Sequence, residues 1–254
     1  MLLLPPSESK AEGTQAKPLK LSTLAHPQLN ELREHVIGAV EKLAKGPRAK
    51  AREVLGLSAK QESEIERDAN LATAKTSPAW QIYSGVLFDA LDAQSLSATA
   101  RKKFEETTFV SSALFGLISV ADHIPAYRLS GDTRLPRLES LARVWSDSVS
   151  SILERQQELI VDLRSGTYVA LGPLPDDVAA VVPKIWQKMP SGPPKIVTHH
   201  NKATKGRIVR ELVATRKRLD TAEVVAEVIA SLGADVDISY AKSHPIINVV
   251  IDVA

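Results

Sequence analysis

Short apolar runs suited to strands alternate along this chain with longer segments whose apolar residues recur every three or four positions. Leu2 to Leu4 stop at Pro5-Pro6, and the run Ile246-Ile247-Asn248-Val249-Val250-Ile251 is mostly β-branched. Strand-length runs bounded by Pro or Gly favour sheet strands, whereas the longer spacing favours helices. Alternation of the two kinds of element predicts the α/β class.

The individual elements follow from the same patterns. Expected strands cover residues 2–4, 108–114, 159–163, 196–198, 236–240 and 246–253, with another around Ile185. Expected helices cover 27–45, 80–91, 97–106, 138–155, 206–214 and 221–232, and 49–72 favours two short helices, the second capped by Ser58. We therefore expect a single mixed-sheet domain over 1–254, with a helical insertion at about 27–107.

The chain contains no cysteine. Disulfides, thiolate metal sites and thiol redox sensing are therefore excluded by chemistry. The apolar start, Met1 to Leu4, is shorter than the apolar region of a signal peptide. No later run reaches the roughly 20 apolar residues that a membrane helix needs. We expect a cytoplasmic protein with no membrane partner.

Basic residues gather in one segment of a chain whose formal net charge is only +2. Between residues 195 and 218, Glu211 is the single carboxylate among Lys195, Lys202, Lys205, Arg207, Arg210, Arg216, Lys217 and Arg218. Such a segment is typical of a phosphate-binding surface. It is equally typical of a solvated helix face, and the sequence leaves both interpretations open.

The polar segment from Ser7 to Lys10 directly follows the first expected strand. In α/β sheets, ligands commonly bind at the carboxyl ends of strands. Lys10 and the hydroxyls of Ser7 and Ser9 could therefore position a nucleophile or hold an anion. An ordinary surface loop is the alternative.

Three further candidates lie between residues 122 and 128. Asp122 could act as a general base or orient Arg128, although an Asp that caps a turn fits the same sequence. Tyr127 could stack on a base while Arg128 binds a phosphate. Alternatively, the Tyr packs beneath the Arg and fixes the loop.

Histidines give little indication of a metal site or cofactor. His199, His200 and His244 could include a ligand, but no spacing here matches a zinc site. The Glu-x-x-His pairing of di-iron bundles is absent from the sequence. Glu31 and His35 lie one helical turn apart, which favours a solvated contact. The sequence thus indicates no metal and no cofactor.

Several separated blocks together resemble the YaaA peroxide-stress family. In order, they are Pro6-Ser7-Glu8-Ser9-Lys10, Tyr83-Ser84-Gly85, Ser112 to Leu117 with Asp122, Pro125 and Tyr127-Arg128-Leu129, then Trp145, Ser165 with Tyr168, and Lys202 with Lys205-Gly206-Arg207. The set spans residues 2 to about 213. Asp162-Leu163-Arg164-Ser165-Gly166-Thr167-Tyr168 departs from the family's Asn-Leu-Ala-Ser-x-Glu-Tyr, and Phe115 replaces a family Tyr.

The resemblance implies a role in surviving hydrogen peroxide, by limiting oxidative DNA damage and free iron. It also implies a single mixed α/β fold with a positively charged cleft, and DNA binding helped by a helix-hairpin-helix element over 49–72. That segment carries Glu62, Glu64, Glu66 and Asp68. Carboxylates beside a phosphate are unfavourable, so we assign this segment no DNA contacts.

Two functional hypotheses follow. In the first, DNA is the partner, and a basic cleft holds its phosphates through Lys10, Arg128, Lys202, Lys205 and Arg207, with Tyr127 beside Arg128. In the second, the chain is an enzyme acting on a nucleotide or nucleic acid through Ser7, Lys10, Asp122, Arg128 and Tyr168. The sequence does not decide between them. It also leaves open a third interpretation, in which the basic segment is a solvated face and the chain acts through a protein partner that the sequence does not identify.

Overall fold

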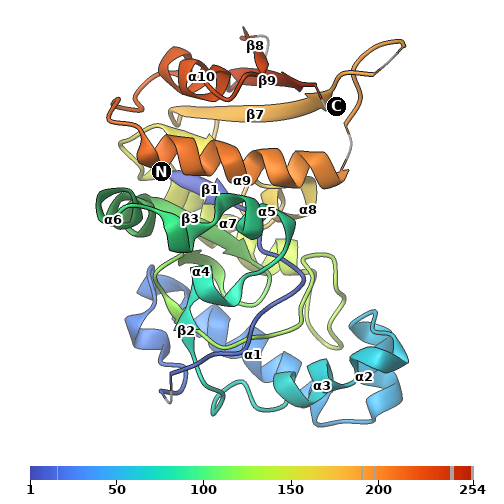
Figure 1. The fold of residues 1–254 in the computed structure, drawn as a ribbon. Coiled ribbons are helices and arrows are strands. Elements are labelled where there is room, and N and C mark those ends of the chain that lie inside the picture. The colour runs from blue at the N-terminus through green and yellow to red at the C-terminus, as the bar shows by residue number, and fades with distance from the viewer. Residues whose placement is uncertain (16, 190, 197, 241–242, 253–254) are drawn as a thin grey trace.

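The computed structural model describes residues 1–254 except 16, 190, 197, 241–242 and 253–254 (Figure 1). Within the described residues, seven strands form one mixed sheet in the order β4-β3-β1-β6-β7-β9-β8. They are β1 Leu2–Leu4, β3 Thr108–Ser112, β4 Gly116–Ser119, β6 Ile160–Asp162, β7 Ala180–Gln187, β8 Asp235–Ser239 and β9 Ile246–Ile251. The α/β class predicted from the alternation is confirmed.

Strand direction divides the sheet into a parallel centre and two antiparallel edges. β1, β3, β6, β7 and β9 run parallel to their neighbours in that group, while β4 and β8 run antiparallel to β3 and β9. β1 lies between β3 and β6 and is buried throughout. A central parallel strand is covered on both faces, which explains its unbroken apolar run. A separate ribbon pairs β2 Ser77–Pro78 with β5 His123–Ile124.

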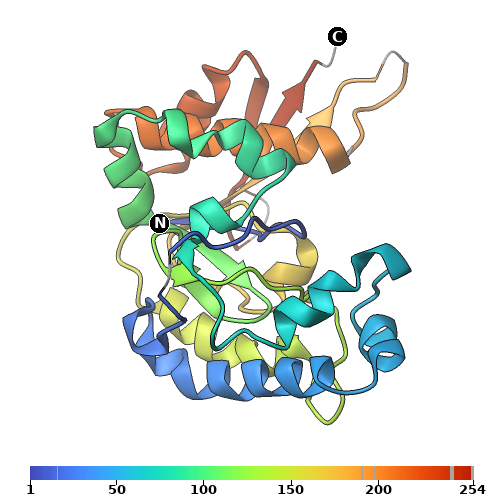
Figure 2. The same ribbon diagram turned by 60° about the horizontal axis from the view of Figure 1, so that its bottom comes forward.

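Helices cover both faces of the sheet (Figure 2). They are α1 Asn30–Ala44, α2 Arg48–Val54, α3 Ser63–Asp68, α4 Ala79–Ile82, α5 Val86–Leu91, α6 Ala98–Thr107, α7 Leu141–Glu154, α8 Gly166–Val169, α9 Thr198–Ala214 and α10 Ala222–Ala230. α5, α6 and α10 pack against α9 on one side, and α1 and α7 lie on the other. No helix in the described part of the chain is long and apolar enough to span a membrane.

Two predicted elements are wrong. The single helix expected over 80–91 is two helices, α4 and α5, because Gly85 adopts φ +95° between them and interrupts the helical backbone. The strand expected over 196–198 is also absent from the described residues of that range. Ile196 is 57% exposed and α9 begins at Thr198, while residue 197 lies outside the described residues. An isolated β-branched run forms no strand without a neighbour to pair with.

Gly206 lets α5 approach α9 more closely than a side chain would allow. A Cβ built on Gly206 lies 2.1 Å from the carbonyl oxygen of Leu87 and 2.9 Å from the amide nitrogen of Leu91. Both atoms belong to the backbone of α5, so neither can turn aside as a flexible side chain would. The helix pair therefore depends on this glycine.

We expect Gly206→Ala to lower the free energy of unfolding by about 1–3 kcal/mol, because α5 must move away from α9. Gly38→Ala is the matched control, since its added Cβ in α1 meets no atom within 4 Å. That change should raise stability by about 0.4–1 kcal/mol by restricting the unfolded chain. Urea denaturation followed by circular dichroism measures both, and equal effects of the two substitutions would contradict the close-contact argument.

Candidate functional site

A cleft with a volume of about 660 Å³ opens at the carboxyl ends of β1 and β6. Its walls come from the loop after β1 (residues 5–9), residues 84 and 85 with the start of α5 (86–88), residues 130 and 132, residue 165 with α8 (167 and 168), residue 196, and α9 (201, 202 and 205). From β1 the chain crosses to β3 on one side and returns to β6 on the other. β1 and β6 thus form the topological switch point, where α/β sheets bind ligands.

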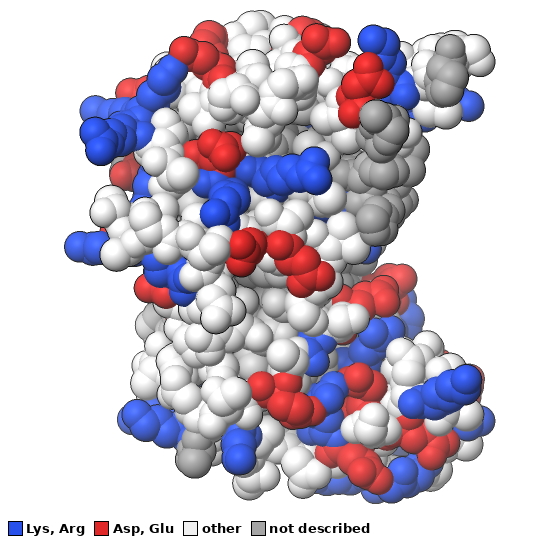
Figure 3. Space-filling model, viewed as in Figure 1, with Lys and Arg blue, Asp and Glu red and all other residues white. Residues whose placement is uncertain are grey.

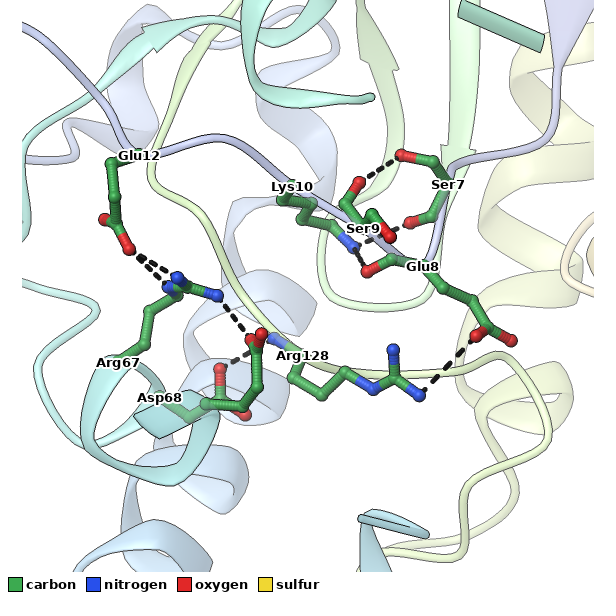
Figure 4. A network of polar contacts seen from close by, with 9 residues as sticks. Ser7, Glu8, Ser9, Lys10, Glu12, Arg67, Asp68 and Arg128 are labelled. Atoms are coloured by element: carbon green, nitrogen blue, oxygen red, sulfur yellow. Dashed lines mark hydrogen bonds and ion pairs between the residues drawn. The ribbon is translucent and has the colours of Figure 1, made fainter. Parts of the chain in front are cut away.

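Lys10 turns back beneath the loop that follows β1, so Ser7, Glu8 and Ser9 line the cleft instead (Figure 4). Its Nζ donates to the carbonyl oxygen of Ser7 at 2.8 Å and to that of Glu8 at 3.4 Å. The ammonium also lies 4.2 Å from the centre of the Tyr127 ring. Burial, assisted by the charge of Arg128, lowers the pKa of Lys10 to about 7. Lys10 therefore acts as a partly desolvated anchor for this wall.

Tyr127 belongs to a buried chain of hydroxyl groups. Its hydroxyl lies 2.9 Å from that of Tyr83 and 2.7 Å from that of Ser112, whose Oγ also accepts from the amides of Leu114 and Phe115. Burial raises the pKa of both tyrosines. Tyr127 is 1% exposed, so its ring offers no face to a stacking base, contrary to the first hypothesis. It packs under a cation, as the alternative predicted, but the cation is Lys10.

Asp68, at the end of α3, is the buried carboxylate that sequence reasoning missed. Its Oδ1 accepts from the backbone N–H of Arg128 at 2.8 Å, while its buried Oδ2 has no hydrogen-bond partner among the described residues. Burial raises the pKa of Asp68 to about 7. The sequence indicated only an acidic helix, because nothing in its local pattern marks this carboxylate as the one that turns inward.

Ion pairs connect the segment after β1 to α3 and to residue 128 (Figure 4). Arg67 pairs with Glu12 and Glu64, and Nη2 of Arg128 lies 3.7 Å from Oε2 of Glu8. Arg128 is thus already partnered, and its side chain is only 16% exposed. The arginine side chains of these pairs are only 16–18% exposed, whereas Glu8 and Glu12 are exposed to solvent. The pairs mainly orient the side chains at the rim.

Asp122 caps a turn and does not orient Arg128. Its two carboxylate oxygens each lie 3.0 Å from the amide of Ala25, and Oδ2 also accepts from the amide of Ser119 at 3.0 Å. Burial raises the pKa of this carboxyl. These contacts occupy both oxygens, and Asp122 does not line the cleft. Its position therefore supports the turn-capping alternative and does not support a role as a base or as a residue that orients Arg128.

The basic segment of α9 has three different environments. Lys205 lines the cleft and donates to the carbonyl oxygens of Leu163 at 2.7 Å and Arg164 at 3.3 Å, and burial lowers its pKa to about 8. Lys202 is exposed at the cleft, and Arg207 is exposed outside its lining. Arg210 instead donates to the carbonyl oxygen of Leu91 at 2.9 Å. Figure 3 shows positive charge along α9, with carboxylates close by.

Tyr168 also lines the cleft and belongs to the short helix α8. Its backbone carbonyl accepts from the Ser111 hydroxyl at 3.1 Å, and burial raises the pKa of its phenol. Ser7 lies on the neighbouring wall and donates to the carbonyl oxygen of Ser9 at 2.6 Å. The cleft therefore brings together Ser7, Tyr168, Lys202 and Lys205 from the sequence candidates, with Lys10 and Arg128 behind its β1 wall.

The departure from the family pattern at residues 162 and 164 forms one structural unit. Nε and Nη2 of Arg164 lie 2.9 Å and 2.7 Å from the two carboxylate oxygens of Asp162, and Nη1 donates to the carbonyl oxygen of Gly172. Both residues are buried, so removing either side chain would leave an uncompensated buried charge. The pair fixes the backbone that carries the carbonyl acceptors of Lys205.

The segment 49–72 contains the expected pair of short helices, α2 and α3. The capping role predicted for Ser58 is wrong in its target, because Ser58 precedes a short 3-10 turn over Ala59–Gln61 and the residue before α3 is Glu62. Arg48 lies 2.7 Å from Glu66, and Arg52 lies 3.3 Å from Glu62. These carboxylates are therefore partnered by α2 itself. Glu62 and Glu66 thus pair with arginines of α2, whereas Glu64 pairs with Arg67 and Asp68 turns inward.

Metal-ligating side chains do not gather in the described part of the chain: no three His, Cys, Asp or Glu residues come together there. His35 is exposed on α1, and Nε2 of His244 is buried without a partner among the described residues. The side chains of His199 and His200 lie outside the described residues.

These features define an α/β protein with a polar, lysine-bearing cleft at the switch point of its sheet. The family model described as peroxide stress protein YaaA matches residues 1–231. The chain therefore belongs to the peroxide stress protein YaaA family, as its separated sequence blocks predicted.

Relatives align with nearly the whole chain. A UPF0246 protein of Streptomyces coelicolor is 39% identical over 239 residues, covering 93% of this chain and 92% of the relative. A UPF0246 protein of Corynebacterium efficiens is 37% identical over 254 residues, covering 98% of this chain and 100% of the relative. The family match over residues 1–231 includes every residue that lines the cleft.

We expect Asp68→Asn to remove one contribution to the pH dependence of the free energy of unfolding. The raised pKa of Asp68 means that the folded state binds its proton more tightly, so this stabilisation is complete below about pH 4 and is lost as pH rises to about 7. Asn retains an oxygen for the Arg128 amide. The wild-type minus variant difference in unfolding free energy should fall by at most about 1.4 kcal/mol per pH unit between pH 4 and 7. Urea titrations at each pH measure it, and a flat difference contradicts the assignment.

Proposed function

We propose that this chain acts in the peroxide-stress response by binding DNA, thereby limiting oxidative DNA damage. The observation that carries the proposal is the position of Lys202 and Lys205, which α9 presents to a hydroxyl-rich cleft at the switch point. Lysines supply the charge that attracts phosphate, and phosphate contacts dominate the affinity of proteins for DNA. Membership of a peroxide-stress family supports the part of the proposal that concerns peroxide stress.

Several cleft hydroxyls are free to contact a ligand. The side chains of Ser84, Ser165 and Thr167 line the cleft and make no hydrogen bonds to other described residues, whereas Ser130 donates to Asp132 at 2.5 Å. Hydroxyl groups both donate and accept, which suits phosphate and sugar oxygens. Because Glu8 and Asp132 also line the cleft, electrostatics favours phosphates on the side of α9.

The size of the cleft limits what enters it. Its volume of about 660 Å³ is that of a small-molecule site, which suits one or a few nucleotides. A duplex would therefore contact exposed cations of α9 through its backbone, Lys202 at the cleft and Arg207 outside its lining. In this proposal Lys10 positions the β1 wall, and Lys205 contributes charge from a fixed place. Tyr127 makes no direct contact with DNA in this proposal, because it is buried.

We expect the double change Lys202→Ala and Arg207→Ala to weaken DNA binding uniformly across sequences. Loss of two phosphate contacts should reduce the slope of log K against log salt by about 1.8 for duplex DNA. The control is Lys17→Ala with Lys20→Ala, which removes the same charge from exposed positions outside the cleft lining. Fluorescence anisotropy at several salt concentrations measures both, and equal losses would show that only net charge matters.

The proposal also includes the lower free iron that the family resemblance implies. We propose that it accompanies the DNA-binding role in cells under peroxide. Electron paramagnetic resonance of chelated iron in whole cells, with and without the Lys202 and Arg207 changes, tests whether the two effects depend on the same residues.

A second candidate is an enzyme that acts on a nucleotide or nucleic acid. The observation in its favour is Lys10, whose pKa of about 7 leaves much of the amine neutral at physiological pH. A neutral amine behind the cleft wall can serve as a base. Ser7 and Arg128 lie close to this amine and Tyr168 lines the cleft, whereas Asp122 is occupied by its turn.

We expect Lys10→Met to abolish any turnover of nucleotides or DNA if the enzyme version holds, because the methionine fills the space without an amine. Lys202→Ala should instead raise KM and leave kcat largely unchanged. Chromatography of products detects turnover, and circular dichroism checks the fold. Turnover that persists in the folded Lys10→Met protein would reject the assignment.

A further inference from the structure

One face of β7, β9 and β8 is covered by helices and the other is open. α9 packs on β7, and α10 packs on β8 and β9. Under these helices the inward residues Val181, Ile185, Ile247 and Val249 are buried. Strand alternation places the next residues on the opposite face. That outer face consists of Val182, Lys184, Trp186, Ile246, Asn248, Val250, Asp235, Asp237 and Ser239.

The apolar residues of the outer face take no part in the core. Val236, Ile238 and Ile251 are partly buried and pack against the core from the inner face. Val182, Trp186, Ile246 and Val250 have intermediate exposure and lie outside that core cluster. A contiguous apolar patch that includes a tryptophan and is rimmed by charges marks an interaction surface.

Hydrogen bonds hold the centre of the outer face in place. Nε1 of Trp186 donates to Oδ1 of Asn248 at 3.2 Å, and Nδ2 of Asn248 donates to Oδ2 of Asp237 at 3.1 Å. This connection runs across β7, β9 and β8. Side chains already fixed in this way lose little conformational entropy when a partner covers them.

Opposite charges flank β9 at the same height of the sheet. Asn248 pairs in register with Lys184 on one side and with Asp237 on the other, so all three lie at one level of the sheet. Lys184 makes no ion pair with any described residue. A positive side chain on one flanking strand thus faces outward at the same height as a negative one on the other.

We propose that a second copy of this chain covers the outer face, with a two-fold axis running along β9. Rotation about that axis places β7 of one copy opposite β8 of the other. Residues at the same height along β9 stay at the same height. Lys184 of each copy then lies opposite Asp237 of the other, while Ile246 and Val250 meet their own counterparts. Such self-complementarity is what an isologous interface requires.

The same charges disfavour a nucleic acid on this face. Asp235 and Asp237 are both exposed and would lie beside phosphates, with Lys184 as the single cation among the nine face residues. A second copy instead pairs each Asp237 with a lysine. Three short strands bury less than the ~800 Å² per partner of a standard interface. The dimer is therefore weak and depends on concentration.

Sedimentation velocity of the full chain over a wide concentration range tests the proposal. Lys184→Asp and Asp237→Lys should each weaken dimerisation at least about tenfold, because like charges then face one another. The double variant Lys184→Asp with Asp237→Lys should restore most of the loss, since opposite charges meet again. Asp220→Lys, an exposed change on another element, should leave the dimer constant unaltered.

Three outcomes would overturn the proposal. One is a monomer at every concentration, and another is a dimer that neither single change weakens, which would lie on another face. The third is a double variant no better than the singles, which would show that Lys184 and Asp237 do not meet. Weaker DNA binding by the folded Lys184→Asp protein, with no change in mass, would assign the face to nucleic acid instead.

Discussion

The pairing of three residues, Leu2 to Leu4, with strands on both sides is the constraint on which the rest of the structure depends. β1 joins β3 to β6, and the terminal ammonium of Met1 donates to the carbonyl oxygen of Leu159 at 2.8 Å. Because β1 is so short, its end at Pro5 fixes where the next residues emerge. The loop over 5–9 and the loop after β6 are thereby placed side by side, and the cleft exists because both strands stop at the same edge.

Burial of opposite charges without direct pairing is the chemical feature behind the cleft. Lys10 and Asp68 each lie near Arg128, yet neither makes an ion pair with a described residue, and burial moves the pKa of each toward neutrality. Asp162 and Arg164 show the contrasting solution, in which two buried charges satisfy one another at short range. The first arrangement leaves groups able to change protonation near pH 7, and the second makes a rigid support.

Sequence patterns predicted most of the elements and about half of the candidate site. Periodic apolar residues were enough for α1, α7 and α10, because one face of each helix is buried. The position of Ser7 after β1 followed from strand topology. The sequence offered a packed Tyr127 and a turn-capping Asp122 only as alternatives, and it could not choose them because each depends on partners far away in sequence, such as Tyr83 and Ala25. Asp68 was missed for the same reason.

The location of β8 and β9 relative to the family match has an evolutionary consequence. The matched region ends at residue 231, before β8 begins, and these two strands extend the sheet beyond β7 without touching a cleft wall. Substitutions on their outer face are therefore insulated from ligand recognition. Substitutions that accumulate there alter one surface of the chain and leave the walls of the pocket between β1 and β6 in place.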